Sequence, residues 1–351
     1  RYVAPYPNGI VFPCRRYQIQ TVGRADRPQH GRFQEFLQCD ADVVGERSLW
    51  QEVEGVLLSD CVFSKLKLKG VQVHLNHRKI LAGIAQCIGA ESQLINFTVA
   101  LDKLSKIGKE GVIKELQSKG FSPESIERLQ AFLSLEGDFE TQISAVARAL
   151  EGIEIAQEGI EELKFIYDQL KRQSLKTVSL KFDVTLARGL NYYTGLILEV
   201  TPPDGVKMGS IGGGGRYDKL TDLFGLQNTS GFGISFGFDR IYLVLEELNL
   251  FPATLDHKTQ LMFLNFGDDS ASFCFDQLIK LRDQELSCEL YPKPAKLKKQ
   301  LNYANQRSIP YVVIMGSEEM QKEVFVLKNM VTGSETEYPL AQMQKIIEEL
   351  N

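Results

Sequence analysis

The sequence predicts an α/β protein with more than one domain. Two β-rich regions flank a long stretch of helical periodicity, and a third region near the C-terminus alternates short strands with helices. At 351 residues the chain also exceeds the size that one hydrophobic core usually serves. We therefore expect a sheet domain that is interrupted by a helical insertion and followed by a small α/β domain.

Composition limits the class of protein. The chain is 43% hydrophobic and 24% charged, as in soluble globular domains, and no apolar run approaches the roughly 20 residues that span a bilayer. We expect a cytoplasmic protein without a membrane segment. The six cysteines include no CxxC pair and there are four histidines, so we predict reduced thiols and no protein-held metal. The net charge of −5 restricts RNA binding to local basic patches.

Near the N-terminus, two alternating runs predict a β-hairpin with a polar face. The runs are Arg15–Arg24 and Phe33–Gly45, and the second places Gln38, Asp40 and Asp42 on one side. The charged loop between them is longer than the two to five residues or so that a hairpin needs, which favours a loop that reaches for a ligand. The alternative is a solvated sheet face with ordinary cross-strand ion pairs.

A helical segment then interrupts the β-rich pattern. A helix-like run, Leu49–Leu68, and an alternating strand, Val71–Asn76, precede it. From Phe97 to Gln173 apolar residues recur at three- and four-residue intervals, which is typical of amphipathic helices. Ser122 and Pro123 offer a capping side chain and a first-turn proline for one of them. We predict that this segment is an inserted helical domain.

The stretch Arg188–Gly195, RGLNYYTG, lies between the β-rich runs Val178–Val184 and Leu196–Val200. One guanidinium, the phenols of Tyr192 and Tyr193 and two glycines offer donors for an anion, hydroxyls for orientation and close backbone approach for a ligand. The alternative is a hairpin whose tyrosines pack on the core, because aromatic residues are favoured in strands.

Two glycine-rich segments follow. Gly209–Asp218 has four consecutive glycines but neither a P-loop ending nor GxGxxG, so it indicates backbone pressed against a ligand or another strand. The flanking Arg216 and Tyr217 favour a ligand. Gly231–Arg240 predicts a small-residue strand that leads into a helix. Arg240 falls in the first turn, where the helix dipole disfavours a cation unless both face an external anion.

The C-terminal region predicts a separate α/β domain with a largely parallel sheet. Its boundary is expected near residues 251–259, and its densest basic cluster comprises Lys293, Lys296, Lys298 and Lys299. A solvated helix face is the alternative for these lysines. The predicted strands are Gln260–Phe266, Ser287–Tyr291 and Tyr311–Met315, and the helices are Ala271–Gln284 and Lys296–Arg307. The predicted domains are residues 1–96 and 176–252 for the sheet, 97–175 for the insertion and 258–351 for the C-terminal unit.

These features, in this order, strongly resemble the histidyl-tRNA synthetases, which are class II aminoacyl-tRNA synthetases. The segments GRADRPQ and FLQ of the hairpin are similar to motif 2 of that class, and GFGISFGFDR is similar to motif 3. RGLNYY resembles the histidine-specific signature of the family and is the most diagnostic part. The resemblance covers nearly the whole chain. It implies a class II antiparallel sheet flanked by helices, a helical insertion and an anticodon-binding C-terminal domain.

The resemblance also implies roles for matching residues. Arg24 and Arg188 would be catalytic, with Arg24 at the α-phosphate of ATP and Arg188 stabilising its charge while the histidine carboxylate attacks. Arg240 would bind the γ-phosphate, and Gln38 and Asp42 the α-amino end of histidine. The implied ATP site comprises Arg24, Asp26 and Arg240. The implied histidine site comprises Gln38, Asp42, Arg188, Tyr192, Tyr193 and Tyr217. The implied contacts to the tRNA acceptor end are Gln29 and Arg32.

The implied activity is that of a histidine–tRNA ligase, a homodimer that forms histidyl-adenylate with ATP and Mg²⁺ and passes histidine to the 3′ end of tRNA(His). A second hypothesis is a histidine-sensing, synthetase-like regulatory subunit of ATP phosphoribosyltransferase. Such subunits usually lack the C-terminal domain and often lose the ATP-binding arginines. This chain keeps the domain and Arg24, Arg188 and Arg240, which favours the enzyme. The missing motifs argue against a P-loop or dinucleotide enzyme.

Some features depart from the common bacterial pattern of the family. Asp26 replaces Glu and Asn191 replaces Asp, which preserves hydrogen-bonding capacity, whereas His30 in place of Lys makes the hairpin loop less basic. The chain begins with Arg1-Tyr2 and no initiator methionine. We therefore expect an N-terminally incomplete sequence, lacking the part where the family carries motif 1, its dimer interface and further histidine contacts.

Overall fold

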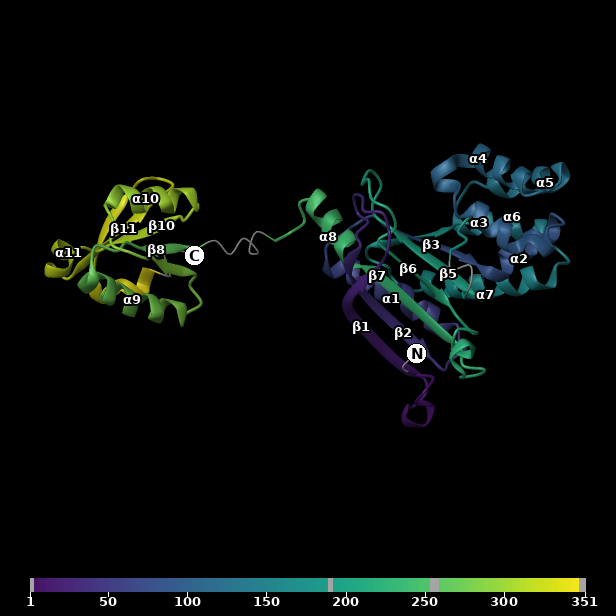
Figure 1. The fold of residues 1–351 in the computed structure, drawn as a ribbon, viewed down its shortest axis with the longest axis horizontal. Helices are drawn as coiled ribbons and strands as arrows, with labels where there is room; N and C mark the ends of the chain where they lie inside the picture. Colours follow the sequence, from purple (N-terminus) through teal and green to yellow (C-terminus); the bar gives the residue numbers. More distant parts are fainter. Residues whose placement is uncertain (1–2, 189–191, 253–258, 347–351) are drawn as a thin grey trace. The chain divides into compact units, whose positions relative to one another are not determined.

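The computed structural model describes residues 3–188, 192–252 and 259–346. The chain divides into two compact units, Arg1–Leu250 and Phe251–Asn351, each with its own hydrophobic core (Figure 1). Parts of three sequence features lie outside the described residues: the first two residues, Gly189–Asn191 of the RGLNYYTG stretch with the Asn191 departure, and residues 253–258 of the expected boundary.

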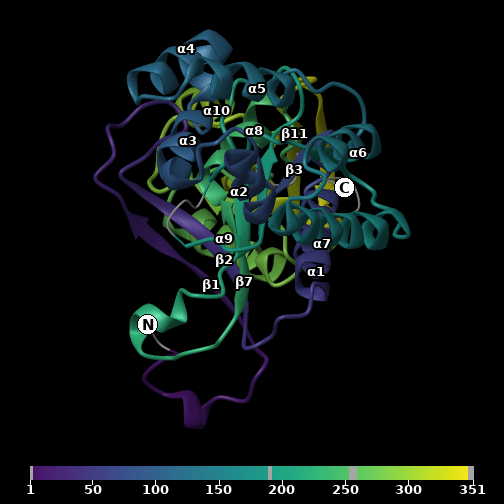
Figure 2. The same cartoon turned by 90° about the vertical axis from the view of Figure 1, so that its right-hand side faces the viewer.

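A seven-stranded sheet organises the first unit, in the order β1-β2-β7-β6-β5-β3-β4 (Figures 1 and 2). Every neighbouring pair is antiparallel except β3 and β4, which are parallel. The antiparallel sheet that the family resemblance implied is therefore confirmed. The strands are β1 (Cys14–Gly23), β2 (Glu35–Val44), β3 (Val71–His77), β4 (Val178–Phe182), β5 (Leu196–Thr201), β6 (Gly212–Arg216) and β7 (Gly231–Gly237).

The predicted hairpin forms, and its register confirms the polar face. Arg16 pairs with Asp42 and Gln18 with Asp40 across β1 and β2. Paired residues project from the same side of a sheet, so these four side chains share one face. That face is the one toward which the candidate site opens.

The alternative of a hairpin across the RGLNYYTG stretch is wrong. β3 lies between β4 and β5, parallel to the first and antiparallel to the second, so β4 and β5 do not pair. The connection instead passes the end of β3, where the amide of Arg78 donates to the carbonyl of Gly195 at 2.9 Å. The four-glycine run is strand β6, between β5 and β7, which confirms that its backbone is pressed against other strands.

Helices cover the sheet of the first unit and form the predicted helical segment. α1 contacts β7 and α7, α2 packs on α7, and α8 packs on β2. All of residues 78–177 are described, and they contain helices but no strand. Ser122 caps its helix as predicted, since its hydroxyl accepts a hydrogen bond from the amide of Ser125 at 3.1 Å. The helices are α1 (Trp50–Lys65), α2 (Arg78–Cys87), α3 (Leu94–Leu101), α4 (Leu104–Ser118), α5 (Pro123–Leu133), α6 (Phe139–Ala149), α7 (Glu154–Lys171) and α8 (Phe238–Glu247), with 3-10 turns Pro7–Gly9, Glu91–Gln93 and Thr221–Phe224.

The second unit has a five-stranded sheet in the order β12-β11-β10-β8-β9. Its three predicted strands are parallel to one another, as expected, but β11 is antiparallel to both β10 and β12, so the sheet is mixed rather than largely parallel. The reason is a C-terminal hairpin that the sequence analysis did not predict. The elements are β8 (Leu261–Phe263), α9 (Asp268–Arg282), β9 (Cys288–Leu290), α10 (Leu297–Gln306), β10 (Tyr311–Ile314), α11 (Ser317–Gln321), β11 (Val324–Asn329), β12 (Glu335–Pro339) and a 3-10 turn, Leu340–Lys345.

Candidate active site

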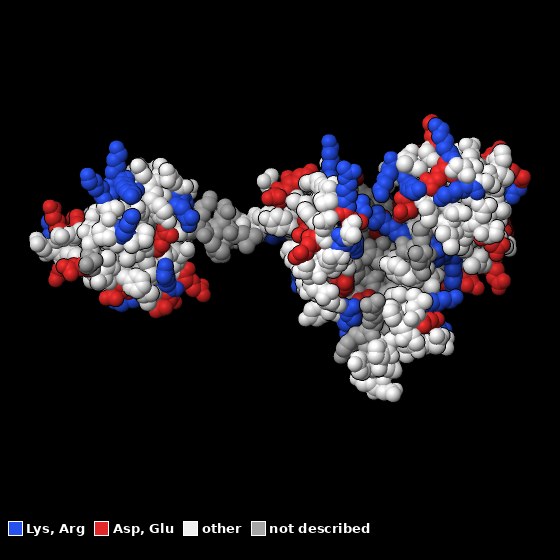
Figure 3. Space-filling view, in the orientation of Figure 1, with Lys and Arg blue, Asp and Glu red and all other residues white. Residues whose placement is uncertain are grey.

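Two adjoining cavities open on the polar face of the first unit's sheet. One has a volume of about 350 Å³ and the other of about 970 Å³, sizes that are ordinary for small-molecule sites. In the space-filling view, Lys and Arg side chains gather around a hollow of this unit (Figure 3). The residues that line both cavities are Gln38, Tyr192, Tyr193, Gly213 and Ser235.

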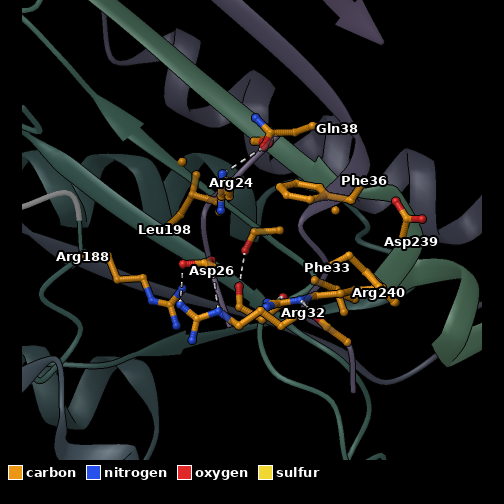
Figure 4. A pocket seen from close by; sticks show the side chains of 18 of the residues that line it. Arg24, Asp26, Arg32, Phe33, Phe36, Gln38, Arg188, Leu198, Asp239 and Arg240 are labelled. Atoms are coloured by element: carbon orange, nitrogen blue, oxygen red, sulfur yellow. Dashed lines mark hydrogen bonds and ion pairs between the residues drawn. The ribbon is translucent and has the colours of Figure 1, made fainter. Parts of the chain in front are cut away.

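Four arginines converge on the smaller cavity (Figure 4). Arg24 follows β1, Arg32 lies in the hairpin loop, Arg188 precedes β5 and Arg240 stands in the first turn of α8. The pKa of Arg240 is lowered, first by burial and then by the charges of the other three. Four positive charges that lie this close together repel one another unless a bound anion compensates them. The smaller cavity is therefore suited to a polyanion.

Arg240 is held in place from two sides. Its Nε donates to the carbonyl of Gly31 and its Nη1 to the carbonyl of Ser210, at 2.6 Å each. The preceding Asp239 accepts a hydrogen bond from the amide of Leu37 at 2.7 Å, which ties the start of α8 to β2. Arg240 therefore lies in the first turn of a helix, as predicted, and it lines a cavity.

Arg24 lines the smaller cavity beside Gln38, which lines both cavities. Its Nη2 donates to Oε1 of Gln38 at 3.1 Å, and its guanidinium carbon is 5.0 Å from the ring centroid of Phe36. Cation–π contact and hydrogen bonding together restrict the rotamers of a long side chain. Arg24 is therefore oriented beside the amide of Gln38.

The hairpin loop supplies a further ion pair. Arg32 and Asp26 approach to 3.0 Å, and the hydrogen bond from Arg32 lowers the pKa of the Asp26 carboxyl. Both residues line the smaller cavity. The family resemblance implied that Asp26 contacts ATP and that Arg32 contacts the tRNA, but in the structure the two side chains pair with each other. Gln29 exchanges backbone hydrogen bonds with Arg32 and lines neither cavity.

The larger cavity contains a connected polar group around Asp42. Oδ1 of Asp42 accepts a hydrogen bond from the phenol of Tyr217 at 2.7 Å, and Oδ2 lies 2.9 Å from Nη1 of Arg16. Burial raises the pKa of Asp42, whereas both partners oppose that rise. Burial also raises the pKa values of Tyr217 and Tyr193, so both phenols remain donors at neutral pH.

Two glycines of β7 make room for this group. A Cβ at Gly231 would collide with the ring of Tyr217, and one at Gly233 would collide with Oδ1 of Asp42. The small-residue strand that the sequence analysis singled out therefore accommodates site side chains. Arg216, which the sequence analysis associated with a ligand, lines neither cavity: it is 5% exposed and paired with the buried Glu52.

Most of the predicted site residues come together, and two further residues join them. Arg16 was missed although it alternates with Gln18 on the polar face of β1. Glu199, a carboxylate in an otherwise apolar strand, was missed although it pairs with Arg188 at 2.7 Å. The predicted residues that line the cavities are Arg24, Asp26, Arg32, Gln38, Asp42, Arg188, Tyr192, Tyr193, Tyr217 and Arg240.

Comparison with known proteins identifies the family. A model of the histidyl-tRNA synthetase family matches residues 1–241. The chain belongs to this family. A model of the anticodon-binding domain matches residues 262–350. Synthetases of this class use ATP, and an anticodon-binding domain implies a tRNA partner. Among the residues that the structure describes, no helix is long and apolar enough to cross a membrane.

Curated relatives and solved structures agree with the family. A histidine–tRNA ligase of Christiangramia forsetii is 56% identical over 96% of this chain and 74% of its own length. That of Flavobacterium johnsoniae is 52% identical over 99% and 73%. The crystal structure of histidyl-tRNA synthetase from Nostoc sp. PCC 7120 aligns with a TM-score of 0.80 and 27% identity, over 99% of this chain and 81% of that one. An ATP phosphoribosyltransferase regulatory subunit/histidyl-tRNA synthetase from Bacillus halodurans, at 21% identity and a TM-score of 0.67 over 86% and 74%, shares the fold.

Proposed function

We infer that this chain is a histidine–tRNA ligase. The inference rests on two adjoining cavities, one lined by arginines and the other built around Asp42 and Tyr217. The close relatives of the chain are named histidine–tRNA ligase. One cavity suits a triphosphate and the other a small molecule with several hydrogen-bond donors. The regulatory alternative is not favoured, because relatives at 46–56% identity are named histidine–tRNA ligase.

The first reaction is activation of histidine. Its carboxylate attacks the α-phosphorus of ATP, a new O–P bond forms, the bond to the bridging oxygen breaks and pyrophosphate leaves. Negative charge on the α-phosphate oxygens is stabilised by preoriented guanidinium groups. We propose Arg24 and Arg188 for this role and Arg240 for the γ-phosphate. Asp26 belongs to the ATP site, where it also orients Arg32.

The larger cavity is the proposed histidine site. The α-ammonium and imidazole N–H groups of histidine are donors, and the cavity offers the amide oxygen of Gln38, the carboxylate of Asp42 and the phenol oxygens of Tyr192, Tyr193 and Tyr217 as acceptors. Gln38 also lines the smaller cavity, so a substrate that it holds lies beside the phosphates.

The second reaction is transfer to tRNA(His). A terminal ribose hydroxyl of the tRNA attacks the carbonyl carbon of the adenylate and AMP leaves. We propose that Gln29 and Arg32, in the hairpin loop, face the acceptor end. In the second unit the exposed Lys293, Lys296, Lys298 and Lys299 lie on or just before α10, where Figure 3 shows gathered basic side chains, and they suit contacts to RNA phosphates.

Mg²⁺ is proposed to accompany ATP. Within the described residues, no group of three or more His, Cys, Asp or Glu side chains is placed to hold a metal ion. Mg²⁺ commonly binds through substrate phosphates with few protein ligands, so the residues present fit an ion carried by the triphosphate. Its chemistry there is neutralisation of phosphate charge, beside the arginines.

We further propose that the protein is a cytoplasmic homodimer. β1 is an edge strand whose face away from the cavities carries Tyr17, 80% exposed, and Ile19, 63% exposed. Apolar side chains on an unpaired edge favour association with another surface. Sedimentation of the protein as a monomer would refute the dimer.

The decisive experiment is ATP–pyrophosphate exchange with each amino acid in turn. Exchange with histidine alone, followed by charging of tRNA(His), is the expected result. Binding of histidine without exchange would instead favour the regulatory function.

A further inference from the structure

Arg188 is half-exposed, and its guanidinium forms an ion pair with Glu199. Its Nη2 lies 2.7 Å from Oε1 of Glu199, with the arginine side chain 51% exposed and the glutamate side chain 13% exposed. A long side chain that has many rotamers in water is therefore tethered to a group on a rigid strand, β5.

The sheet register places Glu199 on the face of the site. Glu199 pairs with Gly213 of β6, Gly213 with Ser235 of β7, and Ser235 with Asp40 of β2. Paired residues share a face, so Glu199 projects from the same side as Asp40. Gly213 and Ser235 line both cavities, and Gly213 adds no side chain between Glu199 and the space beside it.

Glu199 is linked to two arginines of the smaller cavity: to Arg188 directly and to Arg240 through Ser210. Burial raises its pKa, while Arg188 and the hydroxyl of Ser210 oppose the rise. The carbonyl of the same Ser210 accepts the hydrogen bond from Arg240. A buried carboxylate beside a polyanion site is electrostatically unfavourable for the anion unless a guanidinium compensates it.

We propose that Glu199 is the positioning residue of Arg188: it holds the guanidinium at the edge of the smaller cavity, where the α-phosphate of ATP reacts. This rests on the proposed function. Glu199 contacts no substrate in this account and acts only through Arg188. Preorientation of a charged group in the ground state is what makes it effective in the transition state.

The test is a double-mutant cycle in histidine-dependent ATP–pyrophosphate exchange with Glu199→Gln, Arg188→Ala and the double variant. Glu199→Gln should lower kcat about 10-fold to 100-fold, the range of couplings between contacting residues, with the KM for histidine nearly unchanged. The double variant should be no slower than Arg188→Ala alone. Glu54→Gln is the matched control, because it removes an Arg–Glu ion pair of 2.7 Å, with Arg15, away from both cavities.

Three outcomes would overturn the proposal. An unchanged kcat for Glu199→Gln would mean that the pair does not contribute to the reaction, and a higher kcat would mean that it restrains Arg188 instead of positioning it. Additive losses in the cycle would mean that Glu199 acts on its own, and a raised Mg²⁺ requirement would make it a metal ligand. Absence of exchange in the unaltered protein refutes the proposed function instead. In that case, crystal structures with and without Glu199→Gln decide, since an undisplaced Arg188 contradicts positioning.

Discussion

The phenol of Tyr217 donates a hydrogen bond to Asp42, with 2.7 Å between the two oxygens, although the residues are 175 positions apart in the chain. Strand β7 lies between them in the sheet, and its glycines leave room for the contact. The two side chains form a hydrogen-bonded pair in the larger cavity. The contribution of this hydrogen bond to histidine binding can be measured by substitution.

Replacement of Tyr217 by Phe removes the donor and keeps the ring. Asp42 then retains Arg16 as its partner, and one hydrogen bond to a buried carboxylate is worth about 1–2 kcal/mol. We expect the KM for histidine in ATP–pyrophosphate exchange to rise about tenfold, with a smaller change in kcat. Tyr311→Phe, in the second unit, is the control. An unchanged KM would remove Tyr217 from the histidine site.

Replacement of Gly233 by Ala tests the room that β7 leaves for Asp42. The added Cβ collides with Oδ1 of Asp42, so the carboxylate must move. We expect a large rise in the KM for histidine and little change in the KM for ATP, because the arginines line the neighbouring cavity. Gly9→Ala is the control, since a Cβ there meets nothing within 4 Å. Equal losses for both substrates would indicate misfolding, which a thermal melt detects.

Replacement of Arg188 by Ala tests transition-state stabilisation. A group that acts mainly in the transition state affects the rate more than binding. We expect adenylate formation in single-turnover experiments to fall about 10²-fold to 10³-fold, while calorimetry shows histidine binding nearly unchanged. Equal losses of rate and affinity would assign Arg188 to ground-state binding.

The stability of the first unit should depend on pH through Glu162. Burial alone would raise its pKa, but hydrogen bonds from His77 and Lys79, at 2.9 Å and 2.5 Å, outweigh burial and lower the pKa from 4.5 to about 2. A depressed carboxyl pKa stabilises the folded state above the unfolded value, and this contribution is lost as the pH falls from about 4.5 towards 2.

Glu162→Gln should therefore lower the free energy of unfolding at neutral pH by about 1–3 kcal/mol. Urea unfolding at a series of pH values measures this difference, which should shrink below pH 4.5. Glu161→Gln, at an exposed neighbouring position, is the control. A difference that does not vary with pH would show that packing, and not charge, accounts for the loss.

Local patterns predicted most of the elements. Alternation located β1, β2 and β3, and a capping serine with a proline located the start of α5. The hairpin of β11 and β12 escaped because β12 is a short, mostly exposed edge strand, Glu335–Pro339, which has no buried face to produce an apolar alternation. The hairpin alternative for RGLNYYTG failed because its two flanking strands both pair with β3, a strand from the other side of the insertion.

The sequence alone determined which side chains share a face, because the period of a strand is a local property: Gln38, Asp40 and Asp42 were placed together before any partner was known. The order of strands decided the rest. Tyr217 reaches Asp42, Arg16 joins them and Arg216 pairs with Glu52, and these are contacts between segments far apart in the chain. Such contacts depend on which strands become neighbours, and the burial of the whole sheet decides that.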